Sequence, residues 1–537
     1  MTAPLNQPAD QDPVIIETEV IESSTNENDS KGAVPAWLMS IGAHAAMVAI
    51  MAAVVYASAP VEEELPPLRV TTLPETQQEK PKEKFSIKDP EEHIEIITEQ
   101  AEKTQPVSVV EITNIETTFE EEHPEKGNPG ETDAVAAVET GGKGLSMSMG
   151  AGSQGAGMFS KRKGGNKIRA SAISRTGPER TRSTEAALRW FKRHQSPNGM
   201  WDVDNYQVNC LDGMPKCEPG VNQAGNADIA CTAYAVMCFL GAGYDHHVPN
   251  KYRSTVTKAV EWLLAQQSAD GLFGERNYEH AVATMALAEA LGMTGDESLK
   301  GPAQKAVNII LARQAKDPKA NDPAYAGLGW DYVEGNAARN DTSVTGWNLM
   351  ALKSASGAGL QVGSGMAGAK VWLERAWKAS NPDWKTLDPY QSESFFPYTY
   401  DANSDKAGNN GATGHLFSVG ALCAVYLGHH KGDVMLETMA NSIMKHNYPT
   451  AYPTNTYILY YNTLAIFQIG GERWDKWNKP VATLLLNSQR TDDSCFNGSW
   501  DYAGTQFHGS DTGRLLSTAY ACLSQEVIWR YEQIGNK

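Results

Sequence analysis

Cysteine, tryptophan and tyrosine are scarce over long stretches of this chain, and their distribution excludes several classes of protein. Seven cysteines among 537 residues are too few for a disulfide scaffold, and no Cys-x-x-Cys pair with metal-binding spacing occurs. All Trp and Tyr residues except Trp37 and Tyr56 lie beyond residue 170. The first third therefore lacks the large side chains of a packed core. We expect the folded domain to span residues 178–537.

Positive charge is also in short supply. The formal net charge is −18, and acidic runs such as those at 62–64 and 120–122 concentrate it in the first third. This balance excludes nucleic acid as an expected partner. The composition predicts a disordered acidic tail at 1–35, a disordered Pro/Glu-rich acidic linker at 60–140 and a Gly/Ser/Met-rich linker at 141–177.

Long apolar runs are absent except at 36–59, which has no charged residue. Twenty residues or so of this kind suffice for a helix that crosses a ~30 Å hydrocarbon layer. Ala57-Ser58-Ala59 also fits a signal-peptide cleavage site, but the preceding leader is long and Pro60 follows directly. We expect an uncleaved signal anchor in the inner (cytoplasmic) membrane. The long linker then predicts a single-pass protein whose C-terminal domain is extracytoplasmic.

The predicted membrane helix contains Ser40 and His44. A histidine in hydrocarbon is costly and often functional, although one near the end of a span also reaches headgroup water. The Ser-x-x-x-His helix, followed by a Pro/Glu/Lys-rich stretch, resembles the N-terminus of TonB-type energy transducers. That resemblance implies coupling to a proton-driven motor complex through these two residues.

The folded region contains internal repeats in which an amphipathic helix ends in Gln, a Gly turn follows, and an aromatic residue closes the unit. Gly permits the turn, the aromatic ring packs back on the helix, and Gln can bond exposed carbonyls at the helix end. The three repeats are Gln195, Gly199 and Trp201; Gln267, Gly271 and Phe273; and Gln489, Gly498 and Trp500.

Helices rich in small residues and apolar all round lie between amphipathic helices, as a helix surrounded by others requires. The predicted inner helices span 228–240, 280–291, 341–354, 415–427, 457–469 and 511–531. The predicted outer helices span 184–194, 252–267, 302–314, 367–379, 434–446 and 473–489. This alternation predicts an all-α fold, an (α/α)6 toroid with six inner and six outer helices. An open superhelix is the alternative, but it needs polar caps that the sequence does not show.

The Gln-x-x-x-Gly-x-Trp turns resemble the repeats of squalene-hopene cyclases. The six helix pairs are similar to the toroid of terpenoid cyclases and protein prenyltransferases. The layout resembles bacterial membrane-anchored proteins that carry prenyltransferase/squalene-oxidase repeats. For cyclases, the resemblance implies an Asp-x-Asp-Asp-Thr acid cluster. Here Ala338 and Asn340 replace two of its acids and only Asp341 remains, so squalene cyclisation is not expected.

Prenyltransferases bind zinc through Asp-x-Cys and a distant His on inner helices. Asp493 and Cys495 match that spelling, but they follow an outer helix, and only His508 comes later. No Gly-Cys-Gly-Glu-Gln thioester motif occurs. We therefore expect no metal and no cofactor. Cys210 and Cys217 share a loop that a disulfide could bridge outside the cytoplasm. The sequence predicts buried thiols on apolar helix faces at Cys231, Cys238, Cys423 and Cys522.

A closed ring places the starts of the inner helices around one rim, where helix dipoles and side chains converge. Candidate catalytic residues there are Asp341, His415 and Asp511, and Asp228 and His280 are candidate ligand contacts. An Asp at a helix start also serves as an N-cap. Trp347, Tyr457 and Tyr461 are candidate cavity-lining residues, and a core role fits them equally.

Three functions remain open from the sequence. The first is a tethered binding or scaffolding module for a peptide, glycan or lipid. The second is an enzyme that uses the rim acids and histidines, and the third is an energy-coupled transducer. Whether the chain is an enzyme stays undecided at this point.

Overall fold

The computed structural model describes residues 156–162, 167, 170–172, 174, 176–223, 227–321, 327–333, 338–408, 416–505 and 508–534. Contacts divide the chain into two units, 1–109 and 110–537, and every described residue lies in the second. The predicted tail, membrane helix and acidic linker lie outside the described residues, as do Ser40 and His44. Within the described ranges, no helix combines the length and apolarity needed to cross a bilayer.

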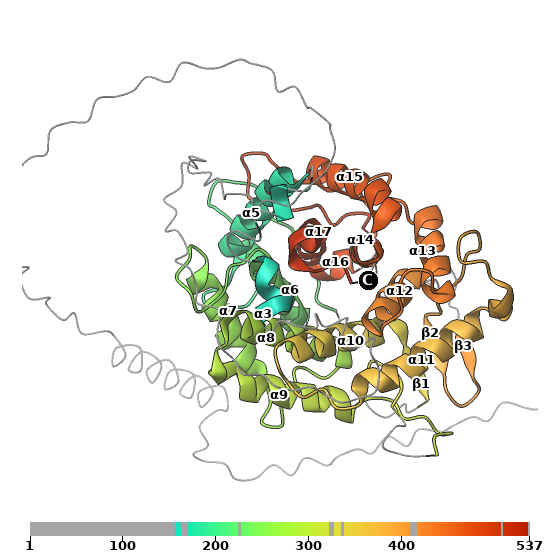
Figure 1. Cartoon of the computed structure of the whole chain (residues 1–537). Coiled ribbons are helices and arrows are strands. Elements are labelled where there is room, and N and C mark those ends of the chain that lie inside the picture. The colour runs from blue at the N-terminus through green and yellow to red at the C-terminus, as the bar shows by residue number, and fades with distance from the viewer. Residues whose placement is uncertain are drawn as a thin grey trace, which may run out of the picture. The chain divides into compact units, whose positions relative to one another are not determined.

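Six of the described helices form an inner ring (Figure 1). Each packs against the next, and the last contacts both the fifth and the first, so the ring is closed. Their side chains are buried nearly all round, as their small apolar residues predicted. The inner helices are α6 (Ala227–Gly241), α8 (Asn277–Thr294), α10 (Thr342–Gly357), α12 (Phe417–Tyr426), α14 (Thr456–Ile469) and α17 (Arg514–Arg530).

Six helices surround this ring, and each buries one face against it. In the third of them, the buried positions are Leu299, Ala303, Ala306, Val307 and Ile310, which is the spacing of a single helix face. The outer helices are α5 (Gly177–His194), α7 (Arg253–Gln266), α9 (Glu297–Ala312), α11 (Gly365–Ser380), α13 (Val434–His446) and α15 (Gly471–Ser488). The predicted α/α toroid is confirmed for the described part of the chain.

The structure differs from the prediction at the rim. The last inner helix is interrupted, because Gly513 (φ +58°) separates the short α16 (Gly509–Thr512) from α17. A small antiparallel sheet, which the sequence did not predict, joins β1 (Arg339–Asp341), β2 (Thr399–Asp401) and β3 (Lys406–Gly408). Its strands have only three residues each, too short for a periodic signal.

The repeated turns have a common hydrogen-bond pattern. Nε2 of Gln195 donates to the carbonyl of Gly199 at 2.8 Å and to that of Thr255, in the first turn of the next outer helix, at 2.9 Å. Gln267 repeats the pattern with Gly271 and Pro302. The glutamine therefore ties its own turn to the following repeat. The carbonyls that it bonds belong to the turn and to the next outer helix, and not, as predicted, to the exposed end of its own helix.

In the first and last of these repeats, the tryptophan of the turn bonds back to its own outer helix. Nε1 of Trp201 donates to the carbonyl of Phe191 at 2.8 Å, and Nε1 of Trp500 donates to that of Leu485 at 2.9 Å. Both carbonyls lie in the last turn, where intrahelical donors run out. The indoles are fully buried. The aromatic residue thus caps the helix end as well as filling space beneath it.

The ring closes through the same turn. Nε2 of Gln489, in the last repeat, donates to the carbonyl of Ser183 in α5 at 2.9 Å. Buried Arg180, also in α5, donates to carbonyls of Ser524 and Asn478. The first outer helix is therefore fastened to the last helix pair.

Part of the predicted Gly/Ser/Met-rich linker packs on the toroid. Residues 156–162 form α3 (Ala156–Phe159) and the 3-10 turn η1 (Ser160–Arg162). The ring of Phe159 lies against Gly292 near the end of α8. Arg162 is fully buried and donates to Glu289 at 2.8 Å and to the carbonyl of Arg530 at 3.2 Å. This segment therefore lies against the C-terminal ends of the inner helices.

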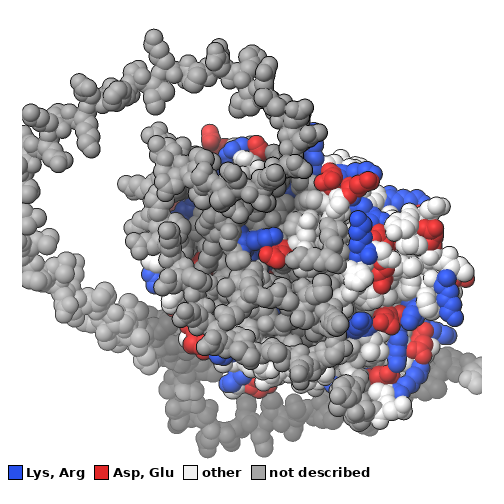
Figure 2. Space-filling view, viewed as in Figure 1, with Lys and Arg blue, Asp and Glu red and all other residues white. Residues whose placement is uncertain are grey.

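Figure 2 shows acidic and basic side chains interspersed on the described part of the visible face. They do not gather there into a patch of one sign. Exposed charges among the described residues also pair with one another, for example Lys378 with Glu374 and Lys445 with Glu393.

Candidate functional site

Asp341, the one acid retained from the cyclase cluster, is the N-cap of α10. Its Oδ1 accepts hydrogen bonds from the N–H groups of Ser343 at 2.9 Å and Val344 at 3.1 Å. Arg339 pairs with this carboxylate and with Asp331. Burial raises the pKa of Asp341, and the bonds from Ser343 and Val344 oppose that shift. The N-cap interpretation fits this geometry, and both carboxylates beside Arg339 are paired.

Asn340 is a buried structural amide. Its Oδ1 accepts from the N–H of Gly329 at 2.7 Å, and its Nδ2 donates to the carbonyls of Ala338 at 2.9 Å and Tyr400 at 3.3 Å. The side chain thereby fastens β1 to β2 and to the turn at 327–330. A neutral amide in this place supplies no proton to a substrate.

Asp228 and Asp511 also bond to backbone. Oδ1 of Asp228 accepts from the N–H of Val203, and Oδ1 of Asp511 accepts from that of Gln223, each at 2.8 Å. Burial raises the pKa of Asp228. The structure thus uses both carboxylates to hold the loop 203–223 at the rim.

His280 occupies a position that threonine holds in other repeats. Its Nδ1 accepts from the N–H of Phe273 at 3.1 Å, and its Nε2 lies 3.0 Å from the carbonyl of Ala306, to which it donates. Both ring nitrogens therefore bond to backbone within a fully buried site. The equivalent N–H of the turn tryptophan is accepted by the hydroxyls of Thr232, Thr345 and Thr518.

Replacing His280 with threonine should make stability less dependent on pH. Burial lowers the pKa of His280 from 6.5 to about 4, so in acid the unfolded chain binds a proton that the folded chain excludes. The wild type should lose up to ~3 kcal/mol from this group as the pH falls through that interval. His280→Thr keeps an acceptor for Phe273 but does not titrate. Urea unfolding across this pH range measures the effect, and equal slopes for both proteins would contradict it.

Trp347, Tyr457 and Tyr461 lie in the middle of the inner ring, where they contact other aromatic side chains. Trp347 stacks on Tyr460 with centroids 6.3 Å apart and donates from Nε1 to the hydroxyl of Tyr278 at 2.9 Å. Tyr457 and Tyr461 lie 4.9 Å apart. All of these except Tyr278 are at most 1% exposed. The core interpretation fits the aromatic candidates, since rings from opposite helices meet at the centre. His415 lies outside the described residues.

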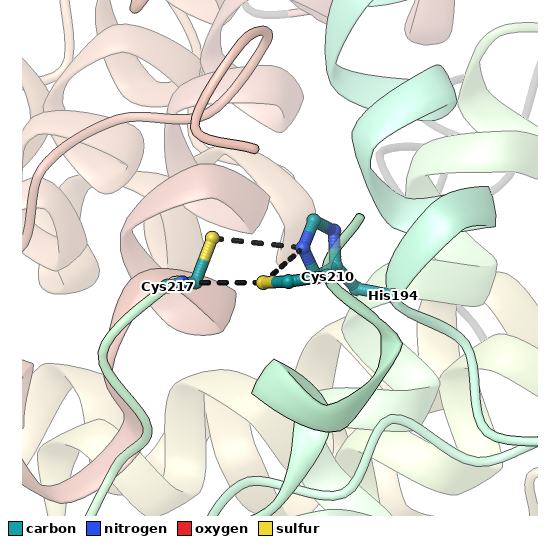
Figure 3. Close-up of side chains that lie close together, drawn as sticks. All are labelled: His194, Cys210 and Cys217. Atoms are coloured by element: carbon teal, nitrogen blue, oxygen red, sulfur yellow. Dashed lines mark hydrogen bonds between the residues drawn. The ribbon is translucent and has the colours of Figure 1, made fainter. Parts of the chain in front are cut away.

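A group that the sequence did not predict lies at the end of α5, shown in Figure 3. Nε2 of His194 is 3.4 Å from Sγ of Cys210 and 3.5 Å from Sγ of Cys217. All three side chains are buried, and their ligand atoms lie within 4.8 Å of one another. The two cysteines follow the 3-10 turn η2 (Tyr206–Asn209) and are free thiols. Side chains of this kind in such a group are able to hold a metal.

Cys495 adjoins this group from the last repeat. Its Sγ accepts the N–H of Leu211 at 2.9 Å, and its carbonyl lies 3.6 Å from Sγ of Cys217. The expectation of a metal-free chain rested on spacing along the sequence. Cys495 is 278 positions from Cys217 and reaches it only because the ring closes. The signal available was that His194 and Cys495 both flank repeat turns, one in the first repeat and one in the last.

Comparison with known proteins supports the fold. Residues 168–400, from before α5 to β2, match the family model of the squalene-hopene cyclase C-terminal domain. No curated protein matches the sequence. None of the comparisons supports the resemblance to TonB-type transducers.

Among solved structures, the chain is similar to the GH76A alpha-1,6-mannanase from Salegentibacter sp. HEL1_6 (11% identity, TM-score 0.44, covering 65% of this chain and 98% of that one). It is also similar to the unsaturated glucuronyl hydrolase from Bacillus sp. GL1 (13% identity, TM-score 0.43, covering 64% and 95%). The closed double ring shows that the described part of the chain is an α/α toroid, and residues 168–400 of it are similar to the squalene-hopene cyclase C-terminal domain.

Proposed function

We propose that this chain is a membrane-tethered, extracytoplasmic protein whose toroid is a non-catalytic binding or scaffolding module. The observation that carries the proposal is the aromatic packing at the centre of the inner ring. Tyr234, Trp347, Tyr460 and Tyr520 come from four different helices and touch one another there, with centroid separations of 5.1–6.5 Å. The centre of the ring, where a ligand cavity was a candidate, is occupied by the protein's own side chains.

An open groove on the outer surface suits a ligand better than the filled centre of the ring does. It has a volume of about 800 Å³ and lies between α15 and the segments at 449–453 and 501–503. Its walls combine apolar Pro449, Tyr452 and Leu484 with polar Asn487 and Asp501. An aromatic and proline surface beside hydrogen-bonding groups favours a peptide or a glycan over a lipid.

The proposal is tested by blocking the groove while the rim acid is altered separately. Thr483 and Asn487 are exposed one turn apart on α15. Asn487→Trp should weaken binding to members of an oligopeptide and oligosaccharide panel by at least tenfold, about 1.4 kcal/mol. The matched control is Glu472→Trp, on the same helix but outside the groove lining. Asp341→Asn keeps an N-cap of equal quality and should leave binding unchanged.

An enzyme remains the second candidate, favoured by one observation. Tyr332 and Tyr398 share a hydrogen bond of 2.9 Å beside the buried carboxyl of Asp341. A substrate that the wild type turns over and that Asp341→Asn does not would establish the enzyme and overturn the non-catalytic proposal. The membrane tether is tested by fractionation, where deletion of residues 36–59 should release the protein from the membrane.

A further inference from the structure

We infer that His194, Cys210, Cys217 and Cys495 form a structural zinc site that joins the first repeat to the last. The inference is independent of what the toroid binds. It rests on three buried side chains whose ligand atoms lie within 4.8 Å of one another, and on buried Cys495, which adjoins them. Three cysteines and one histidine are a donor set that closed, structural zinc sites use.

The nitrogen-to-sulfur distances match a tetrahedral zinc. With Zn–N of about 2.0 Å and Zn–S of about 2.3 Å, a tetrahedral ion holds its nitrogen and sulfur ligands about 3.5 Å apart. Nε2 of His194 lies 3.4 and 3.5 Å from the sulfurs of Cys210 and Cys217. The side chains of His194, Cys210 and Cys217 therefore lie close together and face one another, as Figure 3 shows.

The orientation of the His194 ring is fixed by a backbone hydrogen bond to Nδ1. Its Nδ1 lies 2.8 Å from the carbonyl of Trp190, which can only accept, so Nδ1 carries the hydrogen. Nε2 is then the unprotonated nitrogen and turns its lone pair toward the thiols. A histidine that donates from one nitrogen to a carbonyl and offers the other to the metal is the usual arrangement in zinc sites. The indole of Trp190 packs against the ring at 4.4 Å.

The sulfurs of Cys210 and Cys495 have partners suited to thiolates. Sγ of Cys210 accepts the N–H of Cys217 at 3.2 Å, and Sγ of Cys495 accepts the N–H of Leu211 at 2.9 Å. Backbone N–H groups that point at ligand sulfur stabilise its negative charge. A disulfide between two of the three cysteines would use neither the third nor the imidazole.

Charge on the surrounding chain is complementary. One Zn²⁺ with three thiolates and a neutral imidazole has a net charge of −1, and binding releases three thiol protons. Burial raises the pKa of the Cys217 and Cys495 thiols, and Arg514 opposes that rise at Cys217 while Arg193 opposes it at Cys495. Both guanidinium groups therefore favour the metal-bound form.

The site lies where the ring closes. His194 ends the first outer helix, Cys210 and Cys217 precede the first inner helix, and Cys495 follows the last outer helix. Zinc would add a coordination link to the contacts of Gln489 and Arg180. Because it joins segments nearly 300 residues apart, its loss should weaken closure of the whole ring.

The test begins with the full-length chain, purified under reducing conditions without chelator. Metal analysis should find about one zinc per chain, in line with one four-ligand site. Cobalt exchanged into the wild type should give the absorption of a tetrahedral cobalt–thiolate centre. Absence of zinc from the isolated protein, together with no uptake of added zinc or cobalt, would overturn the inference. So would a mass that shows a Cys210–Cys217 disulfide in the folded protein purified in parallel without reductant.

Single variants identify the ligands. His194→Ala, Cys210→Ser, Cys217→Ser and Cys495→Ser should each lower zinc affinity by about 100-fold or more, since even partners that only orient ligands contribute 10–100-fold. Cys423→Ser, a buried thiol on α12, is the matched control and should keep full zinc. If Cys495→Ser binds zinc as the wild type does, the four-ligand site is wrong. For variants that do not fold, alkylation of the wild type decides: zinc should protect three thiols until chelator is added.

Discussion

Replacing Glu289 with glutamine should lower the free energy of unfolding by about 3–5 kcal/mol, because it leaves two buried guanidinium groups without their anion. Glu289, Arg162 and Arg530 are each fully buried, and the carboxylate pairs with both arginines, at 2.8 and 2.6 Å. Burial alone would raise the pKa of Glu289, but the two guanidinium groups outweigh it and hold the pKa below its ordinary value. The carboxylate is therefore charged in the folded protein.

The neighbouring acid, Glu526, compensates little for the loss of the Glu289 carboxylate. Glu526 also contacts Arg530, but burial raises its pKa to about 8, so its carboxyl is largely protonated at neutral pH. Urea unfolding of Glu289→Gln measures the loss. Glu297→Gln removes an exposed pair with Lys300 and should change stability by less than about 1 kcal/mol. Equal effects of the two variants would show that the buried network does not stabilise the fold.

Replacing Gly498 with alanine should destabilise the protein by about 1–3 kcal/mol beyond the backbone strain, because the new methyl group collides with another helix. Gly498 has φ +95°, and a Cβ there would lie 2.2 Å from the carbonyl oxygen of Ala186. The obstacle is backbone of α5, so it cannot rotate away. Relief requires the turn of the last repeat to move off the first outer helix.

Gly432 separates these two effects. Its φ is +91°, close to that of Gly498, and a methyl group added there would have no other atom within 4 Å among the described residues. Gly432→Ala should therefore show only the strain of positive φ, about 1–3 kcal/mol. Thermal unfolding and urea titration of both variants give the difference. Equal losses of stability in the two variants would mean that the close approach of Gly498 to Ala186 contributes nothing.

The helices were predictable because their sequences are consistent over long segments. Small apolar residues on every side of 280–291 indicate a helix enclosed by others, and the structure buries α8 in that way. The sheet was missed because its strands are stabilised by distant partners rather than by a local pattern. Asn340, for example, bonds to Gly329 and Tyr400, which no spacing along the chain indicates.

The candidate site was harder to predict, because side chains change roles when the ring closes. Asp341 and His280 have the chemistry of catalytic groups, but in the structure their hydrogen bonds hold helix ends and turns. In the sequence, Cys495 matched the spelling of a prenyltransferase zinc motif but followed an outer helix. In the structure it is a neighbour of Cys217. The sequence predicted which residues lie on which helices, whereas the contacts between the first and last repeats depend on closure of the ring.

The bond from Gln489 to Ser183 has a consequence for the topology of the chain. It is of the same kind as the bond from Gln195 to Thr255, so the sixth unit joins the first as the first joins the second. The closed ring of helix pairs has no first pair, although the polypeptide has a first residue. A circularly permuted gene that begins at another connection would therefore encode the same set of neighbours.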